Sequence, residues 1–351
     1  MQNIAGKRIV LIGGAGFIGH NLALELKRLG AEVSVIDGLQ VNNLLSLHCQ
    51  TSNHLDRDLY LSIVNERIQL LRMAGIPLYV EDARDYLRLS VILGELQPEV
   101  VVLLAAVSHA SRSNKDPFHT FDHSFRTLEN ALDSSRSSVK HFIYFSSSMV
   151  YGNFEGSAVT EESPCNPMGV YGALKFGAEK LVIAYNQVFG LPYTIVRPSA
   201  LYGERCVSRR VGQVFIENAL QGKDLVIKGD GEECLDFTYI GDLVDGICRC
   251  IGHPQAINQV FNMTCGQGRS LNEMAAIVQQ EFPGIKVSHI ERDALMPERG
   301  TLNIEKARTR VGYEPQNPLQ TGYRKYIQWY RGLFERISAT PRVSAGPQVN
   351  E

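Results

Sequence analysis

The fold is decided by the stretch Arg8-Ile9-Val10-Leu11-Ile12-Gly13-Gly14-Ala15-Gly16-Phe17-Ile18-Gly19. Residues 8–12 form an apolar run rich in β-branched side chains, which predicts a strand buried on both faces. A helix is expected to follow over about residues 17–29. The glycines at 13, 16 and 19 suit a tight turn, a close backbone approach and close packing of helix on strand.

This strand–turn–helix predicts a dinucleotide site. A diphosphate would lie at the helix N-terminus, where free amides and the positive end of the helix dipole face it. We expect cofactor contacts from Gly13, Gly16, Phe17, Ile18 and Gly19. The second strand ends at Asp37, whose carboxylate can accept hydrogen bonds from ribose hydroxyls and would repel a 2′-phosphate. The predicted cofactor is therefore NAD rather than NADP.

Outward from this turn, short strands alternate with helices. The expected strands cover residues 8–12, 32–36, 78–80, 100–104, 141–145 and 193–196. Strands separated by helices predict right-handed crossovers and an α/β fold of the Rossmann type, with a doubly wound parallel sheet. Residues 1–198 form the predicted NAD-binding domain, with an insertion at about 41–77 that contains a helix over 58–73. That insertion suits a lid, an oligomer contact or a plain surface helix.

After Pro198 the pattern changes to a smaller α/β substrate lobe, predicted over residues 199–337, with some chain crossing back at about 235–252. Its expected strands cover 225–228, 259–263 and 286–289. Its expected helices cover 211–221, 271–281, 304–311 and 319–336. Residues 338–351 are polar and predict a disordered tail.

Two further strand ends suit a cofactor. Asp82, followed by Ala83, could accept a hydrogen bond from an adenine amine. The small residues in Leu104-Ala105-Ala106 would let the backbone pass close beneath a cofactor. Each feature alone could equally be structural.

A catalytic pair is predicted at Tyr171 and Lys175, which lie four residues apart and so face one side of a helix. The pKa of a free tyrosine is near 10, too high for a base at neutral pH, and a nearby ammonium would lower it. The strand-end serines before this pair include Ser147, whose hydroxyl can share a proton with Tyr171. Lys175 could also hold the nicotinamide ribose.

Together with Arg197-Pro198, these motifs resemble the extended short-chain dehydrogenase/reductases, from residue 7 to about 330. Within that family the chain is similar to NAD-dependent nucleotide-sugar epimerases, dehydratases and decarboxylases. The resemblance implies a tightly held NAD with Pro198 beside it, and transient oxidation of the sugar, usually at C4. It also implies a homodimer through a four-helix bundle made by the helix near 121–135 and the helix carrying Tyr171.

Positions 148 and 149 narrow the choice of reaction. Dehydratases and decarboxylases usually carry Glu at the second of these positions, and dehydratases often carry Asp at the first. This chain has Ser148 and Met149 instead. Neither can act as an acid or base. We expect a UDP-sugar 4-epimerase, an isomerase. A 4,6-dehydratase or UDP-glucuronate-type decarboxylase is the alternative, and a non-catalytic NAD-binding regulator is a third.

Residues 210–215 resemble UDP-sugar decarboxylases, which favours the decarboxylase and a uridine carrier. The expected substrate contacts are Ser108, Ser148, Met149, Arg205, Arg210, Val211 and Arg299.

Composition excludes other classes. The net charge of −2 gives no reason to expect nucleic acid or an anionic membrane as partner. No apolar run is long enough to span a bilayer, and we expect no signal peptide before the first strand. The seven cysteines lack metal-ligand spacing, so reduced thiols, no metal site and a cytoplasmic location are expected.

Overall fold

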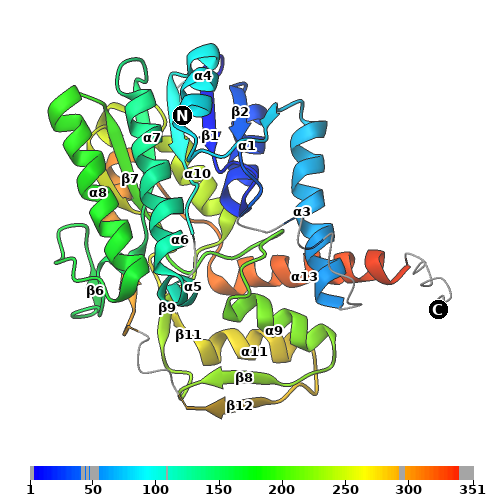
Figure 1. The fold of residues 1–351 in the computed structure, drawn as a ribbon. Coiled ribbons are helices and arrows are strands. Elements are labelled where there is room, and N and C mark those ends of the chain that lie inside the picture. The colour runs from blue at the N-terminus through cyan, green and yellow to red at the C-terminus, as the bar shows by residue number, and fades with distance from the viewer. Residues whose placement is uncertain are drawn as a thin grey trace.

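The computed structural model describes residues 4–40, 44, 47, 55–107, 110–291 and 297–339. Figure 1 shows a large sheet covered by helices on both faces, with a smaller layer of helices and strands below it. The expected Rossmann-type α/β fold is confirmed. The predicted tail begins at 338, but residues 338 and 339 are the last of the final helix. Residues 340–351, most of the first half of the insertion and Ser108 lie outside the described residues.

The sheet has seven strands in the order β10-β7-β5-β4-β1-β2-β3, all of them parallel. The strands, in chain order, are β1 (Arg8–Ile12), β2 (Glu32–Ile36), β3 (Leu78–Tyr79), β4 (Val100–Leu103), β5 (His141–Phe145), β7 (Tyr193–Arg197) and β10 (Gln259–Asn262). The chain leaves β1 toward β2 and later returns to its other side as β4. This reversal opens a crevice at the carboxyl ends of the two strands, where open α/β sheets bind their ligands.

One correction concerns β10. The sequence pattern assigned this strand to the smaller lobe, but it pairs parallel with β7 at the edge of the large sheet. The alternation of short strands and helices is the same in both parts of the chain, so only the pairing reveals the difference.

Helices cover the two faces of the sheet as amphipathic layers. One face packs against α1 (Phe17–Arg28), α10 (Ile240–Cys250) and α12 (Glu305–Val311). The other packs against α4 (Tyr86–Leu96), α7 (Thr127–Ser135) and α8 (Gly169–Phe189). Before α7 come α5 (Ala110–Lys115), α6 (Pro117–Phe121) and the π-helical turn η1 (Asp122–Arg126). Burial of these apolar faces is the main stabilising term of the domain.

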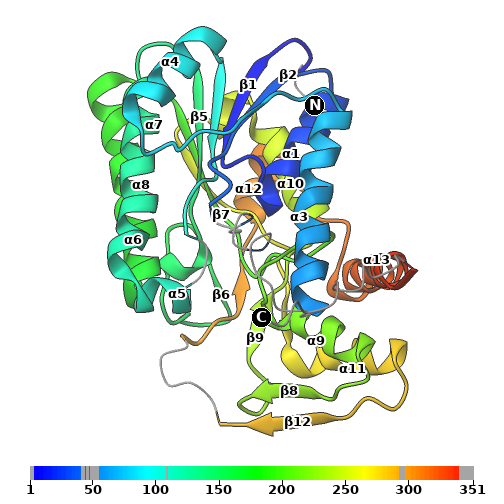
Figure 2. The ribbon, with the colours of Figure 1, turned by 45° about the vertical axis from the view of Figure 1, so that its right-hand side comes forward.

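The smaller lobe has its own core. It contains α9 (Val211–Leu220), β8 (Leu225–Lys228), α11 (Leu271–Glu281), β12 (Val287–Ile290) and α13 (Leu319–Ala339). Two short pairs link it to the sheet domain: β9 (Cys234–Asp236) with β11 (Gly268–Ser270), and β6 (Ala158–Val159) with β13 (Thr301–Leu302). Figure 2 shows the lobe beneath the carboxyl end of the sheet.

The helix of the insertion, α3 (Leu55–Met73), begins three residues before the predicted start and buries one face. Leu59, Tyr60 and Ile63 join the core of the smaller lobe, while Leu71 joins the core under the sheet. Figures 1 and 2 both show α3 running from the sheet down to α13. The helix therefore braces the two parts of the molecule.

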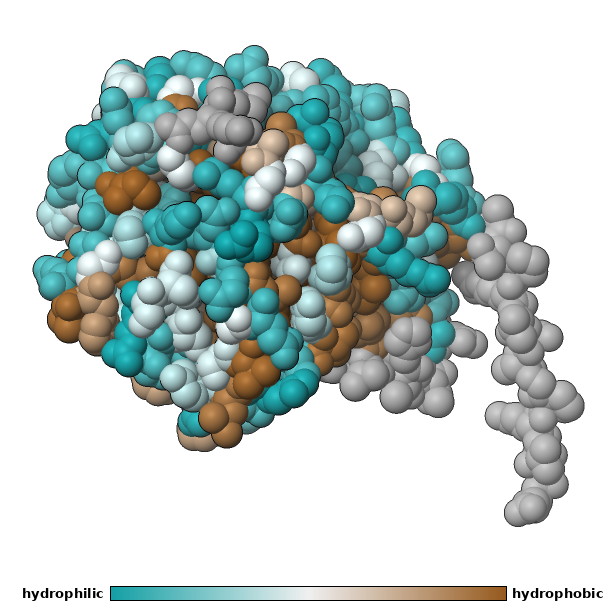
Figure 3. Space-filling model, turned by 90° about the horizontal axis from the view of Figure 1, so that it is seen from above, coloured by the Kyte–Doolittle hydropathy of each residue, from teal (hydrophilic) through white to brown (hydrophobic). Residues whose placement is uncertain are grey.

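The surface is largely hydrophilic, with separate hydrophobic patches, as Figure 3 shows for one face. No helix among the described residues is long and apolar enough to cross a membrane. The six cysteines in the described part of the chain are free thiols, and the same part holds no cluster of metal-binding side chains.

Candidate active site

The glycine turn between β1 and α1 is shaped by contacts that no side chain could share. Gly13 has φ +84°, and a Cβ built there would lie 2.5 Å from the Ala105 backbone nitrogen. A Cβ on Gly19 would lie 2.5 Å from the Gly14 Cα. The turn is thus pressed against the end of β4 and against its own helix, leaving the first amides of α1 facing the crevice.

Asp37 ties the end of β2 to this turn. Its carboxylate accepts hydrogen bonds from the Ala15 amide at 2.9 Å and the Leu39 amide at 2.8 Å. Burial raises the pKa of Asp37, while those two amides and the charge of Arg67 oppose the rise. Each carboxylate oxygen has a second lone pair, so the group can still accept bonds from ribose hydroxyls.

One cavity brings together the cofactor residues predicted from the first four strands. It is lined by Gly13, Gly16, Phe17, Ile18, Gly19, Asp37, Asp82, Ala83, Leu104, Ala105 and Ala106. Sequence reasoning missed further lining residues, namely Gln40, Arg67, Glu81, His123, Thr127, Leu201, Cys206, Val207 and Ser208. Most of these residues come from loops, while His123 lies in η1, Thr127 begins α7 and Arg67 lies in the middle of α3. Pro198, Tyr171 and Lys175 lie outside this lining set.

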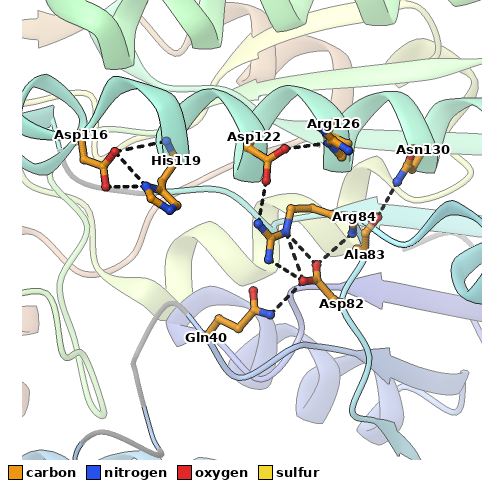
Figure 4. Close-up of polar contacts among 9 residues, drawn as sticks. All are labelled: Gln40, Asp82, Ala83, Arg84, Asp116, His119, Asp122, Arg126 and Asn130. Carbon is orange, nitrogen blue, oxygen red and sulfur yellow. Dashed lines mark hydrogen bonds and ion pairs between the residues drawn. The ribbon is translucent and has the colours of Figure 1, made fainter.

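Figure 4 shows that Asp82 is held by protein partners. Arg84 donates to its carboxylate from Nη2 at 2.6 Å, and Gln40 donates from Nε2 at 2.9 Å. Arg84 also donates from Nη1 to Asp122 at 2.7 Å, linking the end of β3 to η1. Burial alone would raise the pKa of Asp82, but these bonds hold it well below its usual range. The predicted bond to an adenine amine must compete with these partners.

The predicted catalytic side chains are positioned by α8 and by the 3-10 turn η2 (Ser148–Val150). A Cβ on Gly172 would lie 2.7 Å from the Met149 carbonyl oxygen, so the glycine allows α8 to approach η2 closely. The approach brings Tyr171 into hydrogen bonding with Ser147. Ser147 in turn caps η2, where its hydroxyl oxygen accepts from the Met149 amide at 3.2 Å.

The environment of Tyr171 corrects one expectation. Burial raises the pKa of Tyr171, and the groups that oppose the rise are the charge of Arg210 and the hydrogen bond with Ser147. Lys175 is not among them. Its Nζ donates to the Phe145 carbonyl at 2.7 Å and lies over the Tyr144 ring. Burial lowers the pKa of Lys175 to about 8.

The expected substrate residues lie in different parts of the structure. Arg210 lines the cavity and, with Val211, begins α9. Ser148 is buried and Met149 half-buried beside Tyr171's helix. Ser108 lies outside the described residues.

The other two arginines have protein partners. Arg205 donates to His20 at 2.9 Å and to Asn21 at 3.2 Å, both on α1. Arg299 pairs with Glu233 at 3.6 Å. Neither arginine is among the residues that line the cavity.

The loop that closes the cavity is strained. Arg205 and Arg209 have φ of +64° and +49°, and they flank the lining residues Cys206, Val207 and Ser208. Non-glycine residues in this region are uncommon and cluster at ligand sites. The loop is held by Gln213, whose side-chain oxygen accepts from the Ser208 and Arg209 amides at 2.8 and 2.9 Å.

A glycine turn at the switch point of a parallel sheet, with a Tyr–Ser pair nearby, defines a dinucleotide-dependent enzyme of the Rossmann class. The model of the NAD dependent epimerase/dehydratase family matches residues 9–264, and the chain belongs to that family. The resemblance to extended short-chain dehydrogenase/reductases is therefore confirmed, and NAD is the cofactor. The turn fits it, since the glycines at 13 and 19 let the turn pack against the end of β4 and against α1, which leaves the first amides of α1 free to donate to a diphosphate.

Known relatives cover nearly the whole chain. The uncharacterized UDP-glucose epimerase YtcB of Bacillus subtilis is 28% identical over 333 residues, covering 93% of this chain and 99% of its own length. UDP-glucuronic acid decarboxylase 1 of Xenopus tropicalis is 27% identical, covering 94% and 73%. The Bacillus cereus UDP-glucuronic acid 4-epimerase, solved with UDP-glucuronic acid and NAD, superposes with TM-score 0.82 at 26% identity, covering 93% and 99%. Relatives thus include both epimerases and decarboxylases.

Proposed function

We propose that this protein is a UDP-sugar 4-epimerase. Tyr171 removes the proton from the C4 hydroxyl of the sugar in its ionised form, which Arg210 and Ser147 favour against the burial that raises its pKa, and Ser147 holds the same sugar oxygen by a hydrogen bond. A bound NAD would supply the acceptor for the hydride from C4 and the donor for its return to the other face of the keto-sugar. Arg210 favours the phenolate by its charge. Lys175 is tied to the Phe145 carbonyl, and we infer that it orients the cofactor ribose.

The observation that carries this proposal is the chemistry next to Ser147. Elimination or decarboxylation needs an acid or base beside the neighbouring sugar carbon, whereas hydride return needs none. Positions 148 and 149 hold a buried serine and a half-buried methionine. The carboxylates that line the cavity in the described residues, Asp37, Glu81 and Asp82, lie at the ends of β2 and β3, at the adenosine end.

A uridine diphosphate carrier is supported by the relatives. The Bacillus cereus enzyme was solved with UDP-glucuronic acid, and a Thermotoga maritima UDP-glucose 4-epimerase was solved with UDP-glucose. In this chain the start of α9, with Arg210 and Val211, lies at the cavity and offers a guanidinium and helix amides to a diphosphate.

The alternative is a lyase on the same scaffold. Two observations favour it: the resemblance of residues 210–215 to UDP-sugar decarboxylases, and relatives named as decarboxylases and as dTDP-glucose 4,6-dehydratases. In such an enzyme the acid would come from a residue other than 148 or 149.

We also propose a homodimer. The helices expected to form a four-helix bundle expose large apolar side chains: Phe118 and Phe121 on α6 are 77% and 55% exposed. Val188 and Phe189 at the end of α8 are 71% and 45% exposed. Large apolar groups on adjacent helices are typical of a protein–protein interface, and sedimentation velocity would measure the mass.

The experiment that tests the reaction is incubation of the purified protein with UDP-, GDP-, CDP- and dTDP-sugars, followed by NMR and mass spectrometry. We expect a UDP-hexose or UDP-hexuronate to convert to its C4 epimer with unchanged mass. Loss of water or of carbon dioxide would assign the protein to the lyases instead. No conversion of any sugar, with NAD bound, would favour a regulator.

A further inference from the structure

Arg67 is an arginine in the middle of α3 that is buried almost completely, at 1% exposure. Its Nε and Nη2 atoms both donate to the carbonyl oxygen of Arg205, with an Nε–O distance of 2.9 Å. Its Nη1 atom is buried and has no hydrogen-bond partner among the described residues. Two N–H donors of a buried guanidinium are therefore left for something else.

This guanidinium lines the same cavity as Gly16, Phe17 and Asp37. Its charge acts on groups at the glycine-turn end: it opposes the burial-raised pKa of Asp37, and it adds to the burial that lowers the pKa of His20. His20 lies one turn into α1, where its Nδ1 is 2.8 Å from the Gly16 carbonyl. Arg67 therefore lies near both the start of α1 and the end of β2.

The other arginine that lines the cavity in the described part of the chain, Arg210, acts on Tyr171 instead. The two cations thus serve different ends of the crevice. Arg210 belongs to the sugar end, and Arg67 belongs to the end where the dinucleotide is held.

Leaving a buried charged donor unpaired is costly, and it costs more than leaving a neutral donor unpaired. Burial lowers the pKa of Arg67 to about 10, so the side chain remains charged at neutral pH. A bound anion would remove this cost. In a dinucleotide the anionic group is the diphosphate, which the amides at the start of α1 would hold in the same part of the cavity.

We propose that Arg67 is a cofactor-binding residue whose Nη1 donates to the diphosphate of NAD. The guanidinium is held in place from its far side by the Arg205 carbonyl, so it is oriented before the dinucleotide arrives. Because Arg205 begins the strained loop over the cavity, one side chain then contacts both the cofactor and that loop. The insertion helix contributes directly to NAD binding.

The test compares Arg67→Met and Arg67→Lys with Arg72→Met, an exposed arginine on the same helix. We would measure the NAD released from each purified protein by acid, and dissociation constants for ADP-ribose and adenosine. Arg67→Met is expected to lose most of its NAD and to bind ADP-ribose at least tenfold more weakly, with adenosine changed less than twofold. The lysine variant should fall between, and Arg72→Met should match the parent.

A purely structural role predicts a different pattern. If ADP-ribose and adenosine weaken by the same factor, or if neither weakens, the proposal is overturned. Tighter binding of NADP than NAD by the parent would also overturn it, because the anion facing Arg67 would then be a 2′-phosphate. Should Arg67→Met fail to fold, as judged by thermal melting, the lysine variant carries the test. These readouts do not depend on the sugar reaction, so they can fail independently of the proposed epimerase.

Discussion

The glycine turn at residues 13–19 and the loop at residues 205–210 line the same cavity but are built on different principles. The turn works through backbone: its shape is fixed by the absence of side chains, and its donors are amides. The loop is held through side chains, with Arg67 and Gln213 bonding its backbone and Arg205 bonding α1. Backbone geometry depends on neighbouring residues in the sequence, whereas the partners of long side chains depend on which distant residues the fold brings near.

The largest effect is expected at the catalytic end. Tyr171→Phe removes the hydroxyl that bonds Ser147 and leaves the ring in place. Turnover of the UDP-sugar should fall by about 10²–10⁴, the usual contribution of a positioned general base. NAD content should stay the same, because the glycine turn is untouched. Single-turnover reduction of bound NAD, followed by absorbance, would measure the loss; wild-type rates in the variant would contradict the assignment.

A second prediction addresses the backbone-built turn. Gly13→Ala must place a Cβ 2.5 Å from the Ala105 nitrogen at φ +84°. The left-handed conformation costs about 1–2 kcal/mol and the overpacking about 1–3 kcal/mol. We expect loss of bound NAD and a lower melting temperature, read by acid release and differential scanning calorimetry.

The matched control is Gly94→Ala in α4, where nothing lies within 4 Å of an added Cβ. Alanine in an exposed helix interior is favoured over glycine by roughly 0.5–1 kcal/mol, so this variant should keep NAD and melt slightly higher. Retention of NAD by Gly13→Ala at the parental level would mean that the turn tolerates a side chain after all.

The comparison of these two regions also shows which features could be predicted from the sequence. The strand at 8–12, the glycines and Asp37 were predictable, because periodicity and glycine spacing report local backbone states. The placement of β10 was not, since pairing with β7 depends on which edge of the sheet is open. Arg67 carries no motif: it is one of several polar residues in α3, and burial alone distinguishes it.

The partners of three arginines likewise could not be predicted from the sequence. Arg205, Arg210 and Arg299 were all expected to contact the substrate. In the structure Arg205 bonds α1, Arg299 pairs with Glu233, and Arg210 lines the cavity. Acceptors such as His20 lie 185 residues away in the chain, beyond the reach of any spacing rule.

The smallest expected effect separates two of these arginines. Arg210→Met removes a charge from the cavity and should raise the KM for the UDP-sugar about tenfold or more, since a charged hydrogen bond contributes roughly 1.5–3 kcal/mol. Arg205→Met removes the bonds to His20 and Asn21 and should lower the free energy of unfolding by about 1–2 kcal/mol while KM changes by less than threefold. Steady-state kinetics and urea unfolding of both variants make the comparison. If Arg205→Met raised KM as much as Arg210→Met without loss of stability, the loop would present Arg205 to the substrate, and the division between structural and substrate-binding arginines would be wrong.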